Sequence, residues 1–331
     1  MNEDQKIVVV GTGGTIASRY NPSQGRVVAS KEVEEIVGVL PGQEGLPRLE
    51  FQNFAKISGF EMTIEVAHGL VKHVAGLLAN PEVGGVVVTQ GTDTIEETSF
   101  LADLLLPPGK PVVFTGAQLP NDHPQTDGPR NILDSARAAA SPEAVGLGVM
   151  VCFNGRLHAA RDVTKVHTSA LETFQSYDHG ALGSVDEKDV VIFRRPMIRL
   201  TLSAEKLDKR VDLIRLVIGI DARAIDAATA AGVDGLVVEA FGRGNATTAF
   251  GRGVSRACSA GVPVVVTSRC PSGRVKAIYG SGGGGGRDLE DAGAIFAGDL
   301  RGPKARILLM VALSDPSARM RLRELFYTIA P

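Results

Sequence analysis

The run "GGVVVT" at residues 84–89 is continuously apolar and β-branched, with no alternation of polar residues. Strands covered on both faces of a parallel sheet have this pattern. Similar runs occur at residues 7–10 and 112–115, and segments of helical periodicity separate them. The first half of the chain is therefore predicted to be an α/β domain with a doubly wound, mostly parallel sheet. Its expected helices cover residues 31–40, 61–80, 94–106 and 128–140, and a further strand covers 48–57.

The pattern changes after Val145. The Asn154-Gly155 pair is the strongest short-range signal for a tight β-hairpin, so an antiparallel element is expected to follow the parallel core. Alternating strands and helices then resume on a smaller scale. We expect an N-terminal domain at residues 1–193, a charged linker at 194–211, and a second, smaller α/β domain at 212–331.

Composition narrows the classes of partner. The chain has 331 residues, 44% of them hydrophobic, with 35 Lys and Arg against 37 Asp and Glu. This balance gives no positive field for a nucleic acid or an anionic membrane. No apolar run approaches the roughly 20 residues that cross a bilayer. "MNEDQK" leads directly into "IVVV" without a secretory signal, so we expect a cytoplasmic protein that acts on a small molecule.

The cysteine and histidine patterns predict no metal site. Cys152, Cys258 and Cys270 lie beside apolar or small residues, so we interpret them as reduced core thiols. His68 and His73 are five residues apart, which places them on different faces of a helix. The glycine-rich stretch at 280–287 has no Walker lysine, so a flexible exposed loop is expected there in preference to a phosphate cradle.

The first loop follows the first strand, and open α/β sheets bind ligands beyond the carboxyl ends of their strands. Gly11 and Gly13 match the start of a dinucleotide fingerprint, but Ile16 stands where Gly or Ala is required. Residues 18–28 also have the character of a loop instead of the required helix. What remains is Thr15, on a glycine-bent turn where the backbone can approach a ligand closely. Ordinary strand-to-loop geometry is the alternative interpretation.

A second loop, "TQGTDTIEE" at residues 89–97, places Thr92 and Asp93 at the start of a helix. Thr94 is a candidate cap, and Glu96 and Glu97 occupy the first turn. Capping explains one of these residues but not the Gly-Thr-Asp-Thr combination. An aspartate here can hold a ligand ammonium while the N–H groups bind an anion, which suits an α-amino acid.

Lys165 follows the predicted hairpin. A lone lysine is often a solvated charge, but a buried lysine can act as a base for a hydroxyl. Thr92, Asp93 and Lys165 could then act as one hydrogen-bonded unit.

Several motifs together resemble the bacterial-type L-asparaginase/glutaminase family over nearly the whole chain. They are "TGGTIA" at 12–17, "GTDT" at 91–94, "DGPRN" at 127–131, "GRLHAARDVTK" at 155–165 and "RGPKARILL" at 301–309. The resemblance implies that Thr15 attacks the side-chain amide of asparagine, that Tyr20 assists it, and that no cofactor is needed. By the same resemblance, Thr92, Asp93 and Lys165 activate the attack or the water and bind the substrate amino group.

The resemblance also implies the binding contacts and the assembly. Backbone donors near Thr92 and Ala117 would form the oxyanion hole. The family is a homotetramer of two intimate dimers, in which each site lies where one subunit's N-terminal domain meets its partner's C-terminal domain. The implied substrate contacts are Gly14, Ser58, Gly59, Gly91, Ala117 and, across that junction, Asn245.

The chain departs from the family pattern at two places. Gly59-Phe60 replaces the usual Ser-Gln pair, with Ser58 one step early, so Phe60 is expected to narrow the pocket. The acidic residue that secreted members send from the partner aligns near Tyr279-Gly280. We therefore keep a broad-specificity glutaminase/asparaginase open as a substrate alternative.

Two other functional interpretations were weighed. A tRNA-dependent amidotransferase subunit carries an extra N-terminal domain, whereas this sequence begins directly at the first strand. A non-catalytic small-ligand or nucleotide-binding module would use "GTGGT" only as a turn.

Overall fold

The computed structural model describes residues 5–21, 26–29, 44–280 and 282–330, and the helix expected at 31–40 lies outside them. The chain divides into two compact units, Met1–Arg199 and Leu200–Pro331. Both units alternate strands and helices, which confirms an α/β fold with a smaller second unit. No helix among the described residues is both long and apolar enough to span a membrane.

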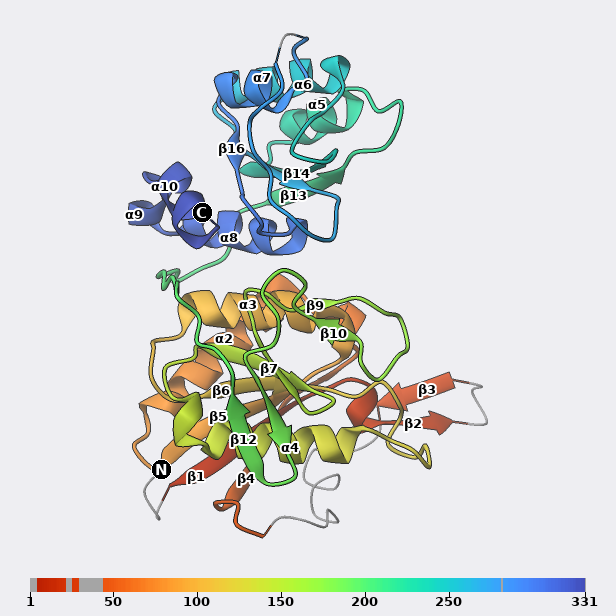
Figure 1. Ribbon diagram of the computed structural model, residues 1–331, viewed down its shortest axis with the longest axis vertical. Helices are drawn as coiled ribbons and strands as arrows, with labels where there is room; N and C mark the ends of the chain where they lie inside the picture. The colour runs from red at the N-terminus through yellow and green to blue at the C-terminus, as the bar shows by residue number, and fades with distance from the viewer. Residues whose placement is uncertain (1–4, 22–25, 30–43, 281, 331) are drawn as a thin grey trace. The chain divides into compact units, whose positions relative to one another are not determined.

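Within its described residues, the first unit contains an eight-stranded sheet with the order β12-β11-β8-β7-β6-β5-β1-β4 (Figure 1). From β4 to β7 neighbouring strands are parallel, and β8, β11 and β12 add an antiparallel edge. The mostly parallel sheet predicted from the β-branched runs is thereby confirmed. The strands are β1 (Lys6–Gly13), β4 (Leu49–Ile57), β5 (Val83–Thr89), β6 (Val112–Thr115), β7 (Val149–Phe153), β8 (Arg156–Ala159), β11 (Gly183–Asp186) and β12 (Asp189–Ile192).

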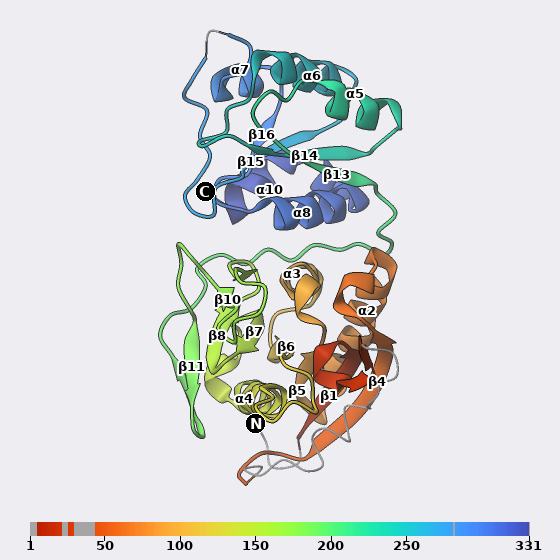
Figure 2. The same cartoon turned by 90° about the vertical axis from the view of Figure 1, so that its right-hand side faces the viewer.

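Helices cover both faces of this sheet. Figure 2 shows α2 (Ile64–Ala79) and α3 (Ile95–Leu105) on one face and α4 (Gly128–Ala140) on the other. Thr63 caps α2 by accepting a hydrogen bond from Val66 N, which satisfies one of the free N–H groups of the first turn. Strand β5 is buried along its whole length, as its unbroken apolar sequence predicts.

The predicted hairpin turn joins β7 to β8. Asn154 and Gly155 have φ angles of 48° and 70°, the left-handed conformations that a tight hairpin turn requires. The stretch at 18–28, expected as a loop, instead pairs as antiparallel strands β2 (Ser18–Asn21) and β3 (Arg26–Ala29). Pairing satisfies the backbone groups of both segments, and the loop prediction was wrong because it gave the β-branched residues here too little weight.

Within the described residues, the second unit has a four-stranded parallel sheet of order β13-β14-β15-β16. Figure 2 shows α5, α6 and α7 on one face and α8 with α10 on the other. The strands are β13 (Val211–Arg215), β14 (Gly235–Ala240), β15 (Val264–Ser268) and β16 (Ile295–Phe296). The helices are α5 (Arg223–Ala230), α6 (Thr248–Ser259), α7 (Gly286–Asp291), α8 (Gly302–Ser314), α9 (Pro316–Arg319) and α10 (Leu322–Ile329).

The glycine-rich stretch wraps around a carboxylate of its own chain. Asp288 Oδ2 accepts hydrogen bonds from the backbone N–H groups of Gly282, Gly283 and Gly285, at 3.2, 2.7 and 3.1 Å. Gly284 and Gly286 are buried, so the expectation of a wholly exposed loop was wrong. Because Asp288 occupies the donors that a phosphate would use, the loop is folded around its own anion.

The cysteines differ in exposure. Cys152 is buried, Cys258 is half-buried and Cys270 is exposed, so the interpretation of all three as core thiols was wrong for Cys270. Cys270 follows the end of β15 in a polar turn, and Ser268 Oγ accepts a hydrogen bond from its backbone N–H. Burial raises the pKa of the Cys152 thiol to about 12 and also raises the pKa of Cys258.

These differences predict the thiol reactivity of the native protein. At pH 8 a disulfide reagent such as Ellman's reagent should modify Cys270 rapidly, because the thiolate is the reactive form and Cys152 stays protonated. All three thiols should react after denaturation. In the Cys270→Ser variant the fast phase should vanish. A fast phase that persists in that variant would contradict this assignment.

Two glycines predict opposite effects on stability. A Cβ on the buried Gly85 of β5 would lie 2.5 Å from Ala139 O of α4, whereas one on the exposed Gly76 of α2 would meet nothing within 4 Å. Gly85→Ala should lower the free energy of unfolding by about 1–3 kcal/mol through overpacking. Gly76→Ala should raise it by about 0.5–1 kcal/mol through helix propensity. Urea denaturation followed by circular dichroism measures both, and equal shifts would contradict the packing described.

Candidate active site

Four adjacent parallel strands of the larger sheet have their carboxyl ends side by side, in the order β4, β1, β5, β6. The loops that follow them carry Ser58, Thr15, Thr92 and Ala117 respectively. Open α/β sheets bind ligands beyond the carboxyl ends of their strands. The candidate residues are therefore grouped by strand order, although they lie far apart in the sequence.

The loop after β1 reaches its neighbour through glycine. Gly13 and Gly14 have φ angles of 98° and 81°, which favour glycine. A Cβ on Gly14 would lie 2.4 Å from Gly91 N, so the two backbones touch where a side chain cannot fit. Since Gly14 precedes Thr15 and Gly91 precedes Thr92, this contact brings the two threonine segments together. Thr15 itself is partly buried and begins a 3₁₀ turn, Thr15–Ala17.

The loop after β4 joins the same contact. A Cβ on Gly59 would lie 2.9 Å from the Gly91 carbonyl carbon and oxygen, so this backbone also packs directly on Gly91. Strands β4 and β5 are separated by β1 in the sheet, and their loops meet beyond its end. The backbones of Gly14 and Gly59 therefore both pack against Gly91.

Lys165 reaches this edge from the antiparallel part of the unit. It lies in β9 (Thr164–Lys165), which pairs with β10 (Phe174–Gln175). Its Nζ atom is 2.8 Å from Thr92 Oγ1 and 2.8 Å from Asp93 Oδ1. The lysine side chain is 16% exposed and that of Asp93 is 54% exposed, so the amino group lies inside and the carboxylate faces outward. A hydroxyl, an amine and a carboxylate are therefore in direct contact, and the carboxylate remains accessible to a ligand cation.

The loop after β6 is held by the "DGPRN" segment. The Asp127 carboxylate accepts hydrogen bonds from the backbone N–H groups of Gln118 and Leu119, at 3.0 and 2.9 Å. Asn131 Nδ2 donates to Gly116 O and to Asp127 Oδ2, both at 3.0 Å. These bonds hold the backbone on both sides of the buried Ala117, at Gly116 and at Gln118. Sequence reasoning quoted this motif but missed its physical role, which is to fix the Ala117 loop.

Thr94 occupies the N-cap position of α3, as expected, but its side chain does not perform the capping function. Its hydroxyl donates to Gly59 O at 2.9 Å and makes no cap hydrogen bond. A short 3₁₀ turn, Thr92–Thr94, leads into α3 and brings the threonine to face the β4 loop. Glu96 and Glu97 do lie in the first turn of α3, as predicted.

Tyr20 and Asn245, which were also predicted as site residues, belong to other segments of the chain. The backbone of Tyr20 is in β2, and its side chain is outside the described residues. Asn245 belongs to the second unit, where its Oδ1 accepts a hydrogen bond from Gly286 N at 3.0 Å. Asn245 thus holds the start of the glycine-rich segment's helix within its own unit.

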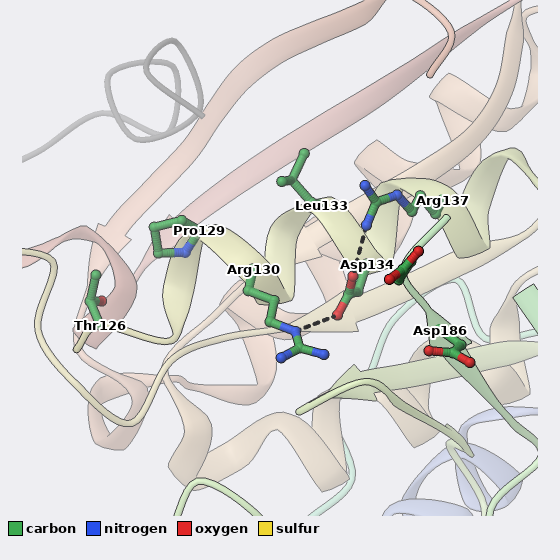
Figure 3. Close-up of a pocket in the computed structure, with 8 residues that line it drawn as sticks. Thr126, Pro129, Arg130, Leu133, Asp134, Arg137 and Asp186 are labelled. Carbon is green, nitrogen blue, oxygen red and sulfur yellow. Dashed lines mark hydrogen bonds and ion pairs between the residues drawn. The ribbon is translucent and has the colours of Figure 1, made fainter. Parts of the chain in front are cut away.

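Two pockets in the described residues are separate from the strand-end cluster. One, of about 530 Å³, lies along α4 (Figure 3), where Arg130 and Arg137 flank the buried Asp134. Burial raises the pKa of Asp134, although the two arginines oppose this shift. Within this pocket, Arg130 and Arg137 thus pair with Asp134.

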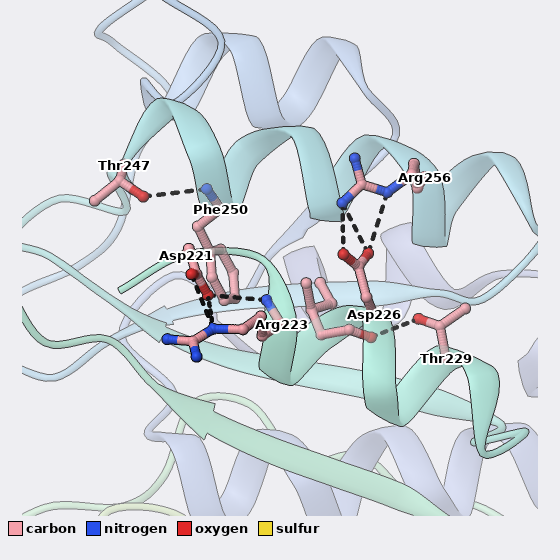
Figure 4. A network of polar contacts seen from close by, with 8 residues as sticks. Asp221, Arg223, Asp226, Thr229, Thr247, Phe250 and Arg256 are labelled. Carbon is pink, nitrogen blue, oxygen red and sulfur yellow. Dashed lines mark hydrogen bonds and ion pairs between the residues drawn. The ribbon is translucent and has the colours of Figure 1, made fainter. Parts of the chain in front are cut away.

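The other pocket, of about 500 Å³, is lined by residues 217–221, 223 and 224 in the second unit. Figure 4 shows the ion pairs beside it, Arg223 with Asp221 and Arg256 with Asp226. These are exposed surface pairs, which hold side chains but contribute little free energy. Among the residues that the structure describes, no cluster of three or more His, Cys, Asp or Glu could hold a metal ion.

Comparison with known proteins places this arrangement in a family. Residues 6–198 match the family model "Asparaginase, N-terminal", and residues 210–326 match "Glutaminase/Asparaginase C-terminal domain". A probable L-asparaginase from Deinococcus radiodurans is 37% identical, with 97% of each chain covered. An L-asparaginase from Bacillus licheniformis is 32% identical over 94% of this chain and 96% of its own.

The fold comparison agrees with the sequence comparisons. The crystal structure of a probable cytoplasmic L-asparaginase from Campylobacter jejuni superposes with a TM-score of 0.88 at 30% identity, covering 98% of this chain and 99% of that one. Both units are matched, and the strand-end cluster lies in the first of them. The chain belongs to the asparaginase/glutaminase family.

Proposed function

We propose that this chain hydrolyses L-asparagine to L-aspartate and ammonia, with Thr15 as the nucleophile. The observation that carries the proposal is the contact of Lys165 Nζ with both Thr92 Oγ1 and Asp93 Oδ1, on a loop that touches the Thr15 loop through Gly91 and Gly14. Family membership supports the reaction class, since the relatives compared above are named as asparaginases.

The reaction has two steps. In the first, Thr15 Oγ attacks the side-chain amide carbon, the C–N bond breaks, the nitrogen takes up a proton, and ammonia leaves a β-aspartyl ester on the threonine. In the second, water attacks the ester carbon, and the Thr15 hydroxyl and aspartate are released. Tyr20 assists the first step with its phenolic oxygen. Thr92 and Lys165 form the proton-accepting pair that activates the attack or the water.

The substrate is held by charge and by backbone donors. Asp93, with its exposed carboxylate, binds the α-ammonium group. The loop containing Ser58 and Gly59 binds the α-carboxylate. Backbone N–H groups near Thr92 and Ala117 stabilise the oxyanion, and such pre-aimed donors act in the transition state without reorganisation.

Glutamine is the second candidate substrate. The family model that matches the second unit is described as a glutaminase/asparaginase domain, which favours this alternative. Phe60, which replaces the usual polar residue, has a side chain that is 73% exposed and adjoins Gly59. The ratio of asparagine to glutamine turnover in the Phe60→Gln variant tests whether this ring sets the substrate preference.

The proposal includes a homotetramer built of two intimate dimers, in which Asn245 serves the partner's site. Light scattering on the purified protein should give four times the chain mass of 34.7 kDa. A monomer that is fully active would contradict this part of the proposal.

Ammonia release tests the proposed chemistry. Thr15→Ala and Thr92→Ala should each lower kcat by about 10³-fold or more and change KM by less than about threefold, because the lost interactions act in the transition state. Thr201→Ala, at an exposed threonine outside the cluster, is the matched control and should leave both constants unchanged. L- and D-asparagine and L- and D-glutamine are assayed over a broad pH range.

Three outcomes of these assays would each contradict a different part of the proposal. No ammonia from any of the four amides would remove the proposed function. Saturable nucleotide binding without amide turnover would instead favour a binding module. A wild-type rate in Thr15→Ala would leave an amidohydrolase but reject Thr15 as the nucleophile.

A further inference from the structure

We propose that the start of α3, residues 94–96, is a two-armed positioning device for the active site. Thr94 is one arm and holds the loop that binds the substrate carboxylate. Glu96 is the other arm and holds Lys165. The inference rests on the proposed function and deepens it, because it assigns each arm to a different kinetic constant.

The Thr94 arm is a directed chain of hydrogen bonds. Thr94 Oγ1 donates to Gly59 O at 2.9 Å and accepts from Gln90 Nε2 at 3.0 Å. Gln90 Nε2 also donates to Thr98 Oγ1 at 3.1 Å, and Thr98 Oγ1 donates to Thr94 O at 3.0 Å. The hydroxyl groups of Thr94 and Thr98 each donate their hydrogen to a backbone carbonyl oxygen, so each can only accept from the Gln90 side-chain amide. This fixes which end of the buried Gln90 side chain faces them.

This series of hydrogen bonds ends at Gly59, where the loop containing Ser58 and Gly59 packs most closely on its neighbour. Gly59 packs on the backbone of Gly91, and Thr94 ties the same glycine's carbonyl to α3. The loop is therefore attached at Gly59 to both the Gly91 backbone and Thr94, which flank the Thr92–Asp93 segment. Because Ser58 and Gly59 hold a group that does not react, their displacement weakens ground-state and transition-state binding alike.

The Glu96 arm closes a ring around Lys165. Glu96 Oε2 accepts a hydrogen bond from the Lys165 backbone N–H at 3.2 Å. The other end of the same lysine, Nζ, contacts Thr92 and Asp93 at 2.8 Å each. Both ends of Lys165 are thus held by one short segment, residues 92–96, although β9 lies about seventy residues further along the chain.

This ring makes Glu96 a positioning residue for the proton-accepting pair. Without it, the backbone of the two-residue strand β9 loses its bond to α3 and keeps its pairing with β10, so the approach of Nζ to Thr92 is less well fixed. The proton transfer belongs to the transition state, so the loss should fall on kcat. A misplacement of about 1 Å can cost about 10²-fold in rate.

The Thr94 arm is tested with an isosteric variant. Thr94→Val should raise KM for L-asparagine by about tenfold or more and change kcat by less than about threefold, because it removes uniform binding. Thr94→Ser keeps the hydroxyl and should restore KM. Ser99→Ala is the matched control: it removes a buried hydroxyl from the same helix that is not part of this hydrogen-bond chain, and it should leave KM unchanged.

The Glu96 arm is tested in the same assay. Glu96→Ala should lower kcat by about 10- to 100-fold with KM changed by less than about threefold. Glu96→Gln keeps an acceptor oxygen and should restore most of kcat. Glu97→Ala removes a carboxylate from the same helical turn and should retain kcat, which separates positioning from the effect of charge at a helix start.

The outcomes distinguish the two proposals. If the wild-type protein turns over no amide, the proposed function fails and this inference fails with it. If the wild type is active but Thr94→Val and Glu96→Ala shift the same constant, or the Ser and Gln variants do not rescue, the inference alone is overturned. The Ser and Gln variants keep the test decisive where a larger change lowers the thermal midpoint.

Discussion

The active edge of this protein depends on the direct contact of two glycine backbones, Gly14 and Gly91. Strands β1 and β5 are parallel neighbours whose register pairs Gly11 with Thr89, so their loops leave the sheet side by side. A Cβ on Gly14 would overlap Gly91 N at 2.4 Å, and only glycine allows this approach. The contact brings together the loops that carry Thr15 and Thr92, which are far apart in sequence, and the proposed reaction uses both hydroxyls.

Lys165, the third side chain of the proposed site, comes from a different part of the first unit. Lys165 comes from the antiparallel segment after the hairpin, and its contact with Thr92 and Asp93 spans more than seventy residues of chain. A partly exposed ion pair of this kind adds little to stability. Its proposed role is to place the Lys165 amino group beside the buried Thr92 hydroxyl. Glu96, which accepts a hydrogen bond from the Lys165 backbone N–H, helps to position that lysine. Residues 90–98 therefore include both side chains that Lys165 Nζ contacts and the Thr94 hydroxyl that bonds to Gly59 O.

Local patterns predicted the parts of the fold that depend on local physics. Unbroken β-branched runs identified the buried parallel strands, and Asn154-Gly155 identified the hairpin. The errors arose where a tertiary contact decided the outcome. Thr94 has the residue type and position of a cap, but its hydroxyl bonds to Gly59 O across the site. Cys270 has small neighbours yet lies exposed after β15, and residues 18–21 become a strand through their pairing with residues 26–29. The meeting of Gly14, Gly59 and Gly91 follows from the strand order β4-β1-β5, which no single segment encodes.

The most direct measurement of the central claim is a crystal structure of the protein with L-aspartate bound. The account predicts that the side-chain carboxylate carbon lies between Thr15 Oγ1 and Thr92 Oγ1, with the ammonium group on Asp93 and the α-carboxylate on the loop containing Gly59. An aspartate bound in the α4 pocket or elsewhere, with the strand-end loops unoccupied at saturating ligand, would contradict it.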